Sequence, residues 1–148
     1  YKCHIMHALM DYGYTTELYG DVYNEIFDAK DGLCAEDVRA EADFYPDVRF
    51  VTTLIKASGG FSVMAHPKVY DSMELLEELA RDGAIDGAEV WHSSADEAYR
   101  SELLALSQRH GLLTTGGSDF HGFYNHYAIQ IGSATTPEES VNRILRLT

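Results

Sequence analysis

The sequence is poor in cysteine and has no long apolar run. Its 148 residues include two cysteines, Cys3 and Cys34, and these have no CxxC spacing. Two cysteines are too few for a disulfide framework, so we expect free thiols in a reducing compartment. No apolar stretch approaches the roughly 20 residues that cross a bilayer. The first residues also lack the pattern of a signal peptide, which is a basic segment followed by an apolar one. These absences predict a soluble, cytoplasmic protein.

Basic residues are also scarce. The chain has 11 Lys and Arg against 24 Asp and Glu, which gives a formal net charge of -13. Because the acidic residues are spread along the chain, most of the surface should repel a nucleic-acid backbone, and we expect no broad nucleic-acid surface and no membrane partner. A small phosphorylated substrate remains compatible with this charge, since bound divalent metals reverse the local field.

The length and the 45% hydrophobic content predict one compact α/β domain. Residues 14–46 are rich in tyrosine and acidic residues and lack apolar strands, so we interpret them as a small helical insertion. The rest, 1–13 and 47–148, is predicted to form the main domain.

Helices and strands are predicted to alternate after Pro46. The predicted helices cover 2–10, 17–27, 35–42, 47–57, 72–81, 96–110 and a last segment from Thr136. The predicted strands cover 61–65, 87–91, 112–115 and 128–131. This alternation indicates a parallel sheet with crossover helices, either open or closed as a barrel.

Polar side chains follow three of the predicted strands. His66 ends the first, His92 the second, and Asp119 and His121 follow the glycine pair Gly116-Gly117 after the third. The carboxyl ends of parallel strands share one edge, where such folds carry their chemistry. Imidazole and carboxylate ligands suit zinc, manganese or iron. Asp119 and His121 are therefore predicted metal ligands, whereas His66 or His92 taken alone also fits a hydrogen-bonded packing role.

Several segments closely resemble the PHP (polymerase and histidinol phosphatase) family. They are Ala65-His66-Pro67 with the residues before it from 55, the strand 87–90, and 110–122 with its Ser118-Asp119-Phe120-His121 motif. Within the family, the chain is most similar to the nucleoside 3',5'-bisphosphate phosphatases and small-RNA 5'-exonucleases. Those proteins also carry a helical insertion, which residues 14–46 resemble.

The resemblance implies part of a distorted barrel of about seven strands. It implies two or three divalent metals (Mn, Zn or Fe) at one rim of the complete protein, and fewer or none in this chain alone. By motif match it assigns His66, Asp119 and His121 as metal ligands, and Asp119 and His121 as catalytic residues. Lys2 and His4 match an Arg-x-His segment that approaches substrate phosphate, with lysine in place of arginine. His92 is a candidate substrate contact or a packing residue.

The family's His-x-His pair and several further ligands have no match in this sequence. By this resemblance the chain holds about half of the metal shell, and we expect it to be inactive or very weak when isolated. Half a barrel exposes strand edges and apolar helix faces, which predicts self-association or pairing with an N-terminal half.

Two other functions fit the same residues. A histidinol-phosphate phosphatase would share the metal site and differ in substrate. A non-catalytic PHP-like accessory domain would keep the fold for protein contact. The insertion favours a nucleotide substrate over histidinol phosphate, and the intact His66, Asp119 and His121 motifs favour an enzyme over an accessory domain.

Overall fold

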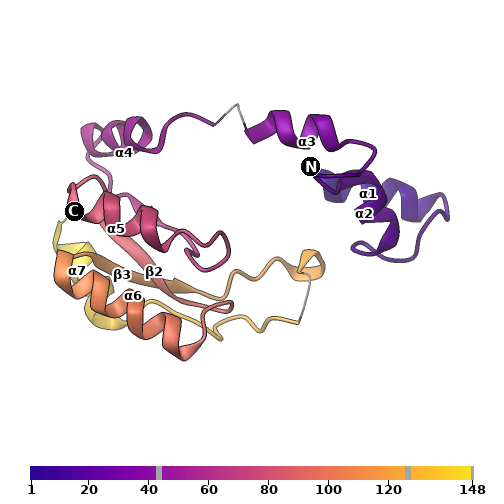
Figure 1. Cartoon of the computed structure of the whole chain (residues 1–148). Helices are drawn as coiled ribbons and strands as arrows, with labels where there is room; N and C mark the ends of the chain where they lie inside the picture. The colour runs from indigo at the N-terminus through magenta and orange to yellow at the C-terminus, as the bar shows by residue number, and fades with distance from the viewer. Residues whose placement is uncertain (43–44, 126–127, 148) are drawn as a thin grey trace. The chain divides into compact units, whose positions relative to one another are not determined.

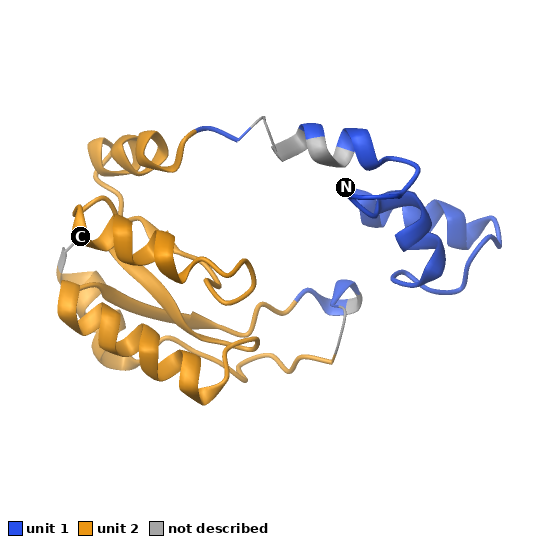
Figure 2. Ribbon diagram, in the orientation of Figure 1, with its two compact units in different colours: residues 1–46, 121–127 blue, residues 47–120, 128–148 orange. Residues whose placement is uncertain are grey.

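The computed structural model describes residues 1–42, 45–125 and 128–147, and its elements are shown in Figure 1. It divides into two compact units, drawn in different colours in Figure 2. Unit 1 comprises 1–46 and 121–127, and unit 2 comprises 47–120 and 128–148. Among the described helices, none combines the length and the apolar character needed to cross a bilayer.

Unit 1 is helical. Its elements are α1 (Lys2–Asp11), α2 (Asp21–Phe27), α3 (Ala35–Ala42) and the short 3-10 turn η1 (Gly122–Tyr124). The helices predicted over 2–10 and 35–42 are confirmed, but the helix predicted over 17–27 begins only at Asp21. The reason lies in a local turn, because the Glu17 backbone N–H donates to the Thr15 hydroxyl at 3.1 Å, a bond that competes with helix formation.

Aromatic rings pack around the buried residues of unit 1. Met6 and Phe27 are buried, and Tyr23 lies with its ring centroid 5.1 Å from that of Phe27 and 5.1 Å from that of Tyr19. Burial raises the pKa of the Tyr19 and Tyr23 hydroxyls. The Tyr19 hydroxyl donates to the Tyr124 carbonyl at 2.9 Å, which ties the turn η1 to the segment before α2.

Unit 2 alternates helices and strands. Its elements are α4 (Val48–Ala57), β1 (Val63–Met64), α5 (Met73–Arg81), β2 (Gly87–His92), α6 (Glu97–His110), β3 (Leu113–Gly117) and α7 (Glu138–Leu147). The strands are parallel in the order β1-β2-β3, which confirms the predicted parallel sheet with crossover helices. Closure of a barrel stays a prediction.

The strand predicted over 128–131 is wrong. No strand forms there, and the chain instead turns, with the Ser133 N–H donating to the Gln130 carbonyl at 3.1 Å and Gly132 at a φ of +77°. Further along, Thr135 pairs with Gly117 of the sheet through an isolated antiparallel bridge. A segment of four residues is too short to specify its pairing by pattern alone, so the turn prevails here.

The core of unit 2 fixes β2 against two helices. Leu76 and Leu79 of α5 and Leu103 of α6 are at most 1% exposed, and they pack in one cluster with Ala88 and Val90 of β2. Their spacing of three along α5 places both leucines on one helix face. One face of β2 is thereby buried under α5 and α6, which leaves the other face to carry polar groups.

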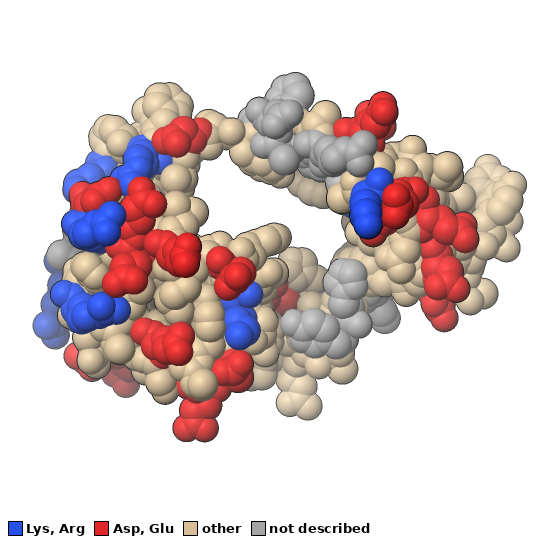
Figure 3. Space-filling view, in the orientation of Figure 1, with Lys and Arg blue, Asp and Glu red and all other residues tan. Residues whose placement is uncertain are grey.

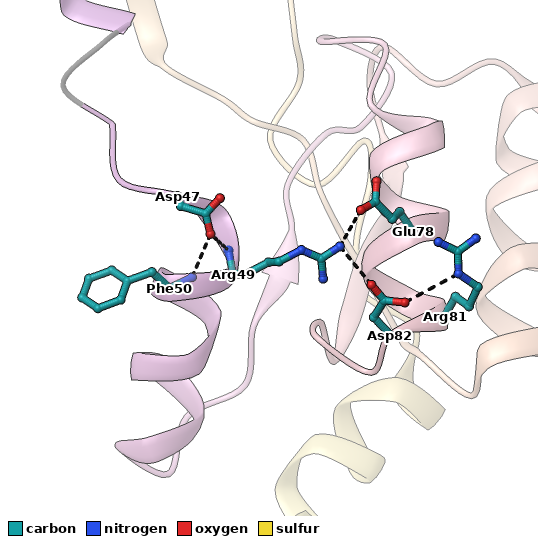
Figure 4. A network of polar contacts seen from close by, with 6 residues as sticks. All are labelled: Asp47, Arg49, Phe50, Glu78, Arg81 and Asp82. Atoms are coloured by element: carbon teal, nitrogen blue, oxygen red, sulfur yellow. Dashed lines mark hydrogen bonds and ion pairs between the residues drawn. The ribbon is translucent and has the colours of Figure 1, made fainter.

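Helix α4 is joined to α5 by polar contacts (Figure 4). The Asp47 carboxylate caps α4 by accepting from the backbone N–H of Arg49 at 2.9 Å and of Phe50 at 3.2 Å. The Arg49 guanidinium forms ion pairs with the carboxylates of Glu78 and Asp82, the latter at 2.9 Å. The hydrogen bond to Glu78 raises the pKa of Arg49. Such exposed pairs orient the helix and stabilise the fold only slightly.

Two exposed carboxylates make stability depend on acid pH. Asp28 accepts from the N–H groups of Lys30 and Asp31, and Asp96 caps α6 by accepting from the Tyr99 N–H at 2.9 Å. These bonds lower both pKa values in the folded state. Their stabilisation is therefore present above the unfolded pKa of about 3.9 and is lost as the pH falls through the lower folded pKa.

We expect the midpoint temperature of thermal unfolding to decrease as the pH is lowered from about 4 to about 3. The decrease should be less steep in an Asp28→Asn/Asp96→Asn variant, because asparagine keeps the capping oxygen without a charge that titrates. Circular dichroism melts across this range measure both slopes. Equal slopes for the two proteins would contradict the assignment.

Candidate functional site

The carboxyl ends of three parallel strands bring four polar side chains to one edge of unit 2. His66 follows β1, Glu89 and His92 lie in β2, and Asp119 follows β3. Three of these, His66, His92 and Asp119, are residues that the sequence placed at strand ends. The structure thus gathers them as expected, while the roles assigned to them stay predictions.

An irregularity in the pairing of β2 with β3 decides which way two of these side chains face. Glu89 pairs with Thr115 and His92 pairs with Gly117, so three residues of β2 are matched by two of β3. Residues paired across strands face the same side, and so do residues two apart within a strand. Glu89 and His92 therefore share a face, although residues three apart in a regular strand lie on opposite faces. The irregularity, a β-bulge beside Val90, re-aims His92.

The two glycines of β3 confirm this arrangement of faces. A Cβ on Gly117 would lie 3.5 Å from Glu89 Oε1, whereas a Cβ on Gly116 would lie 2.6 Å from the Cβ of Trp91. Two hydrogen bonds also fix Gly116. Its backbone N–H donates to the Thr136 hydroxyl at 2.9 Å, and that hydroxyl donates to the Gly116 carbonyl at 3.0 Å. Glycine at position 116 therefore lets the strand end approach its neighbours closely.

His66 has a constrained backbone at the start of its loop. Its φ is +31°, a value that non-glycine residues rarely adopt, and its backbone N–H donates to Glu89 Oε2 at 2.7 Å. Asp119, with a φ of +54°, is constrained in the same way. Such conformations persist where surrounding contacts hold them and are common at functional sites. Glu89 therefore fixes the turn that presents the His66 imidazole.

The His92 imidazole is 4% exposed and has a defined proton. Its Nδ1 accepts from the Ser94 backbone N–H at 3.2 Å and lies 2.7 Å from the Ser94 hydroxyl. A backbone N–H only donates, so these partners assign the neutral tautomer with the proton on Nε2. That nitrogen is buried without a hydrogen bond and lies 3.5 Å from Asp119 Oδ2.

The donor chemistry of this edge fits a divalent metal. The Nδ1 of His66 is buried and has no hydrogen-bond partner, and its ring centroid lies 5.4 Å from that of His92. Carboxylates from Glu89 and Asp119 complete a nitrogen and oxygen set of the kind that zinc, manganese and iron accept. Among the described residues, however, no three His, Cys, Asp or Glu side chains converge on a common cation position. The edge supplies ligands of the right type without forming a complete shell.

The other predicted site residues belong to unit 1. The Lys2 ammonium lies 5.7 Å from the centroid of the Phe27 ring, and the His4 ring is edge-on to Tyr1 at 5.8 Å. The His121 backbone N–H donates to the Asn125 side chain at 2.7 Å. The predicted roles of Lys2, His4 and His121 in phosphate and metal binding stay predictions.

Sequence reasoning missed Glu89 as a candidate site residue. Its signal was present, because Gly87-Ala88-Glu89-Val90-Trp91 places one carboxylate inside an otherwise apolar strand between buried neighbours. A charge there costs free energy unless it is paired or used. A charged residue within a buried parallel strand is therefore itself an indication of a site.

The chain matches known proteins over part of their length. No family model matches it. A phosphoribosyl 1,2-cyclic phosphate 1,2-diphosphodiesterase from Eggerthella lenta is 34% identical over 122 residues, which is 82% of this chain and 44% of that protein. The chain thus spans less than half the length of this relative.

Two solved structures are similar in fold. One, described as a metal-dependent phosphoesterase from Bifidobacterium adolescentis, has a TM-score of 0.67 at 32% identity over 99% of this chain and 50% of that chain. An amidohydrolase from Chromobacterium violaceum has a TM-score of 0.57 at 25% identity over 98% and 51%. The mixed α/β unit with its small parallel sheet is similar to these folds, and the likenesses point to a PHP-like phosphoesterase.

Proposed function

We propose that this chain contributes to the active site of a metal-dependent phosphoesterase that hydrolyses a small phosphorylated ribosyl compound. The observation that carries the proposal is the bulge in β2, which puts Glu89 and His92 on one face beside His66 and Asp119. The names of the Eggerthella and Bifidobacterium relatives support metal-dependent hydrolysis of a phosphate ester.

Each side chain has a distinct task under this proposal. His66 Nδ1 and the Asp119 carboxylate bind the cation, together with His121 by the family motif. Glu89 holds the His66 turn and adds negative charge. The Nε2 proton of His92 is available for a phosphoryl oxygen. When bound, a divalent ion polarises the phosphoryl group and lowers the pKa of water.

The substrate class follows from what two candidates share. Nucleoside 3',5'-bisphosphates, suggested by the sequence resemblance, and the phosphoribosyl cyclic phosphate named for the Eggerthella relative both carry a ribose with two phosphate groups. We therefore propose this class for the present protein. Neither histidinol phosphate nor a non-catalytic role is favoured by the relatives' names.

A metal-binding measurement tests the proposal without requiring turnover. Metal-free chain is dialysed against Mn²⁺, Zn²⁺ or Fe²⁺, and bound metal is counted by mass spectrometry for the wild type, for His66→Ala/Asp119→Asn and for the control His110→Ala at the end of α6. We expect metal in the wild type and the control and little in the double variant. Equal, negligible metal in all three would contradict the proposal.

Hydrolysis is assayed in parallel, with adenosine 3',5'-bisphosphate and ribose 1,2-cyclic phosphate 5-phosphate as substrates and histidinol phosphate for comparison. Any activity should disappear with a chelator and return with metal. Each substrate is followed by the appearance of its hydrolysed product, because opening a cyclic phosphate releases no free phosphate. Faster hydrolysis of histidinol phosphate than of both ribosyl compounds would overturn the substrate class.

The proposed partners are a small phosphorylated substrate and either a second copy or an N-terminal half. Light scattering of this chain alone at micromolar concentration tests the self-association, since a monomer under those conditions would contradict it.

A further inference from the structure

A cavity of about 560 Å³ adjoins the candidate site within unit 2. Its volume lies in the range that small-molecule sites occupy. His92 lines the cavity and also belongs to the candidate site. The polar groups of the cavity include the guanidinium of Arg100 and the hydroxyls of Ser93, Ser133 and Thr135, and these three hydroxyl-bearing residues are exposed.

Arg100 carries a charge that this unit does not neutralise. Its Nη2 donates to the Ala95 carbonyl at 2.9 Å, which fixes the guanidinium, while its Nε is buried without a hydrogen-bond partner. Arg49 and Arg109, by contrast, each pair with carboxylates. Within the described parts of the chain, Arg100 has no carboxylate partner. A partly buried cation without a counter-charge costs free energy that a bound anion would offset.

The surroundings of Arg100 are unusual for so acidic a chain. The net charge is -13, and acidic side chains are spread over both units on the face shown in Figure 3. None of the described residues that line the cavity is Asp or Glu. An anion that enters it therefore meets a cation and hydroxyl donors and no lining carboxylate.

We propose that this cavity binds a phosphate group of the substrate other than the one that is hydrolysed. The planar fork of arginine matches phosphate oxygens, and serine and threonine hydroxyls donate to the remaining ones. This inference rests on the proposed function, because a ribosyl compound with two phosphates can place one at the metal edge and the other beside Arg100. Arg100 is then a specificity-determining residue for doubly phosphorylated substrates.

The test measures binding to metal-free protein, so that phosphate bound through a metal is not counted. The affinities of ribose 5-phosphate, inorganic phosphate and unphosphorylated ribose are compared by calorimetry for the wild type, Arg100→Met and Arg109→Met. Arg109 lies on the same helix, is exposed and pairs with Glu77, so its replacement is a matched loss of charge. Loss of charge-assisted hydrogen bonds should weaken ribose 5-phosphate binding about tenfold in Arg100→Met, with Arg109→Met unchanged.

Equal affinities in the wild type and Arg100→Met would overturn the inference, as would equal binding of ribose and ribose 5-phosphate. Tighter binding of inorganic phosphate than of ribose 5-phosphate would overturn the assignment to a substrate group. If Arg100→Met does not fold, as judged by circular dichroism, Arg100→Lys replaces it, because lysine keeps the charge and loses the fork. If the chain neither binds metal nor hydrolyses these compounds, arginine-dependent binding of ribose 5-phosphate would still support a phosphate site at Arg100, although the proposed function would have failed.

Discussion

Replacing Glu89 by glutamine is expected to weaken divalent-metal binding about 10- to 100-fold while the free energy of unfolding stays nearly unchanged. Glutamine keeps a side-chain oxygen that can accept the His66 backbone N–H, now 2.7 Å from Glu89 Oε2, so the turn at His66 survives. What disappears is the negative charge on the face shared with His92. Competition with a chromophoric chelator measures the affinity, and urea titration measures the stability.

Replacing Glu89 by alanine should have the same effect on metal and an added effect on folding. The His66 N–H then loses its acceptor in a backbone held at a φ of +31°. A hydrogen bond to a charged group contributes about 1.5–3 kcal/mol, and we expect a loss of stability of this order. The control is Glu102→Gln, an exposed position on α6 with the same change of charge. Identical behaviour of all three variants in both titrations would show that Glu89 neither anchors the turn nor supports the metal.

The sequence could predict where the candidate site lies but not which side chains share it. His66, His92 and Asp119 were identifiable because polar residues after buried parallel strands meet at one edge. Glu89 carried a signal as a charge within an apolar strand, but its face could not be predicted, since a regular strand with a period of two places it opposite His92. The bulge depends on how β2 pairs with Gly117 and its neighbours in β3, a contact between distant segments that no local pattern encodes.

The fold shows the same division between local and distant signals. Helix α6 was predicted to within one residue because its ends carry local signals, with the Asp96 side chain as N-cap and Gly111 in the left-handed conformation after the last turn. The segment 128–131 has no such signal, and its apolar residues did not form the predicted strand. Strands depend on partners, so β1 has only Val63 and Met64 in the ladder although 61–65 was predicted.

A Gly116→Ala substitution is expected to lower the free energy of unfolding by about 1–3 kcal/mol, because the added methyl group has no space. It would lie 2.6 Å from the Cβ of Trp91, 2.7 Å from the Trp91 carbonyl oxygen and 2.9 Å from that of Thr135. All three atoms belong to the backbone or are attached directly to it, so none can move by a side-chain rotation. The end of β3 must shift away from β2, and with it the loop that carries Asp119.

Gly117→Ala is the matched control, the same substitution one residue further along β3. Its methyl group would meet a single atom within 4 Å, Glu89 Oε1 at 3.5 Å, which is an ordinary van der Waals distance. We expect a change in stability within about 0.5 kcal/mol, as for a substitution away from tight packing. Urea titrations of both variants decide the matter. Equal destabilisation would mean that the tight approach of β3 to Trp91 does not determine stability, and that Gly116 is replaceable at this edge.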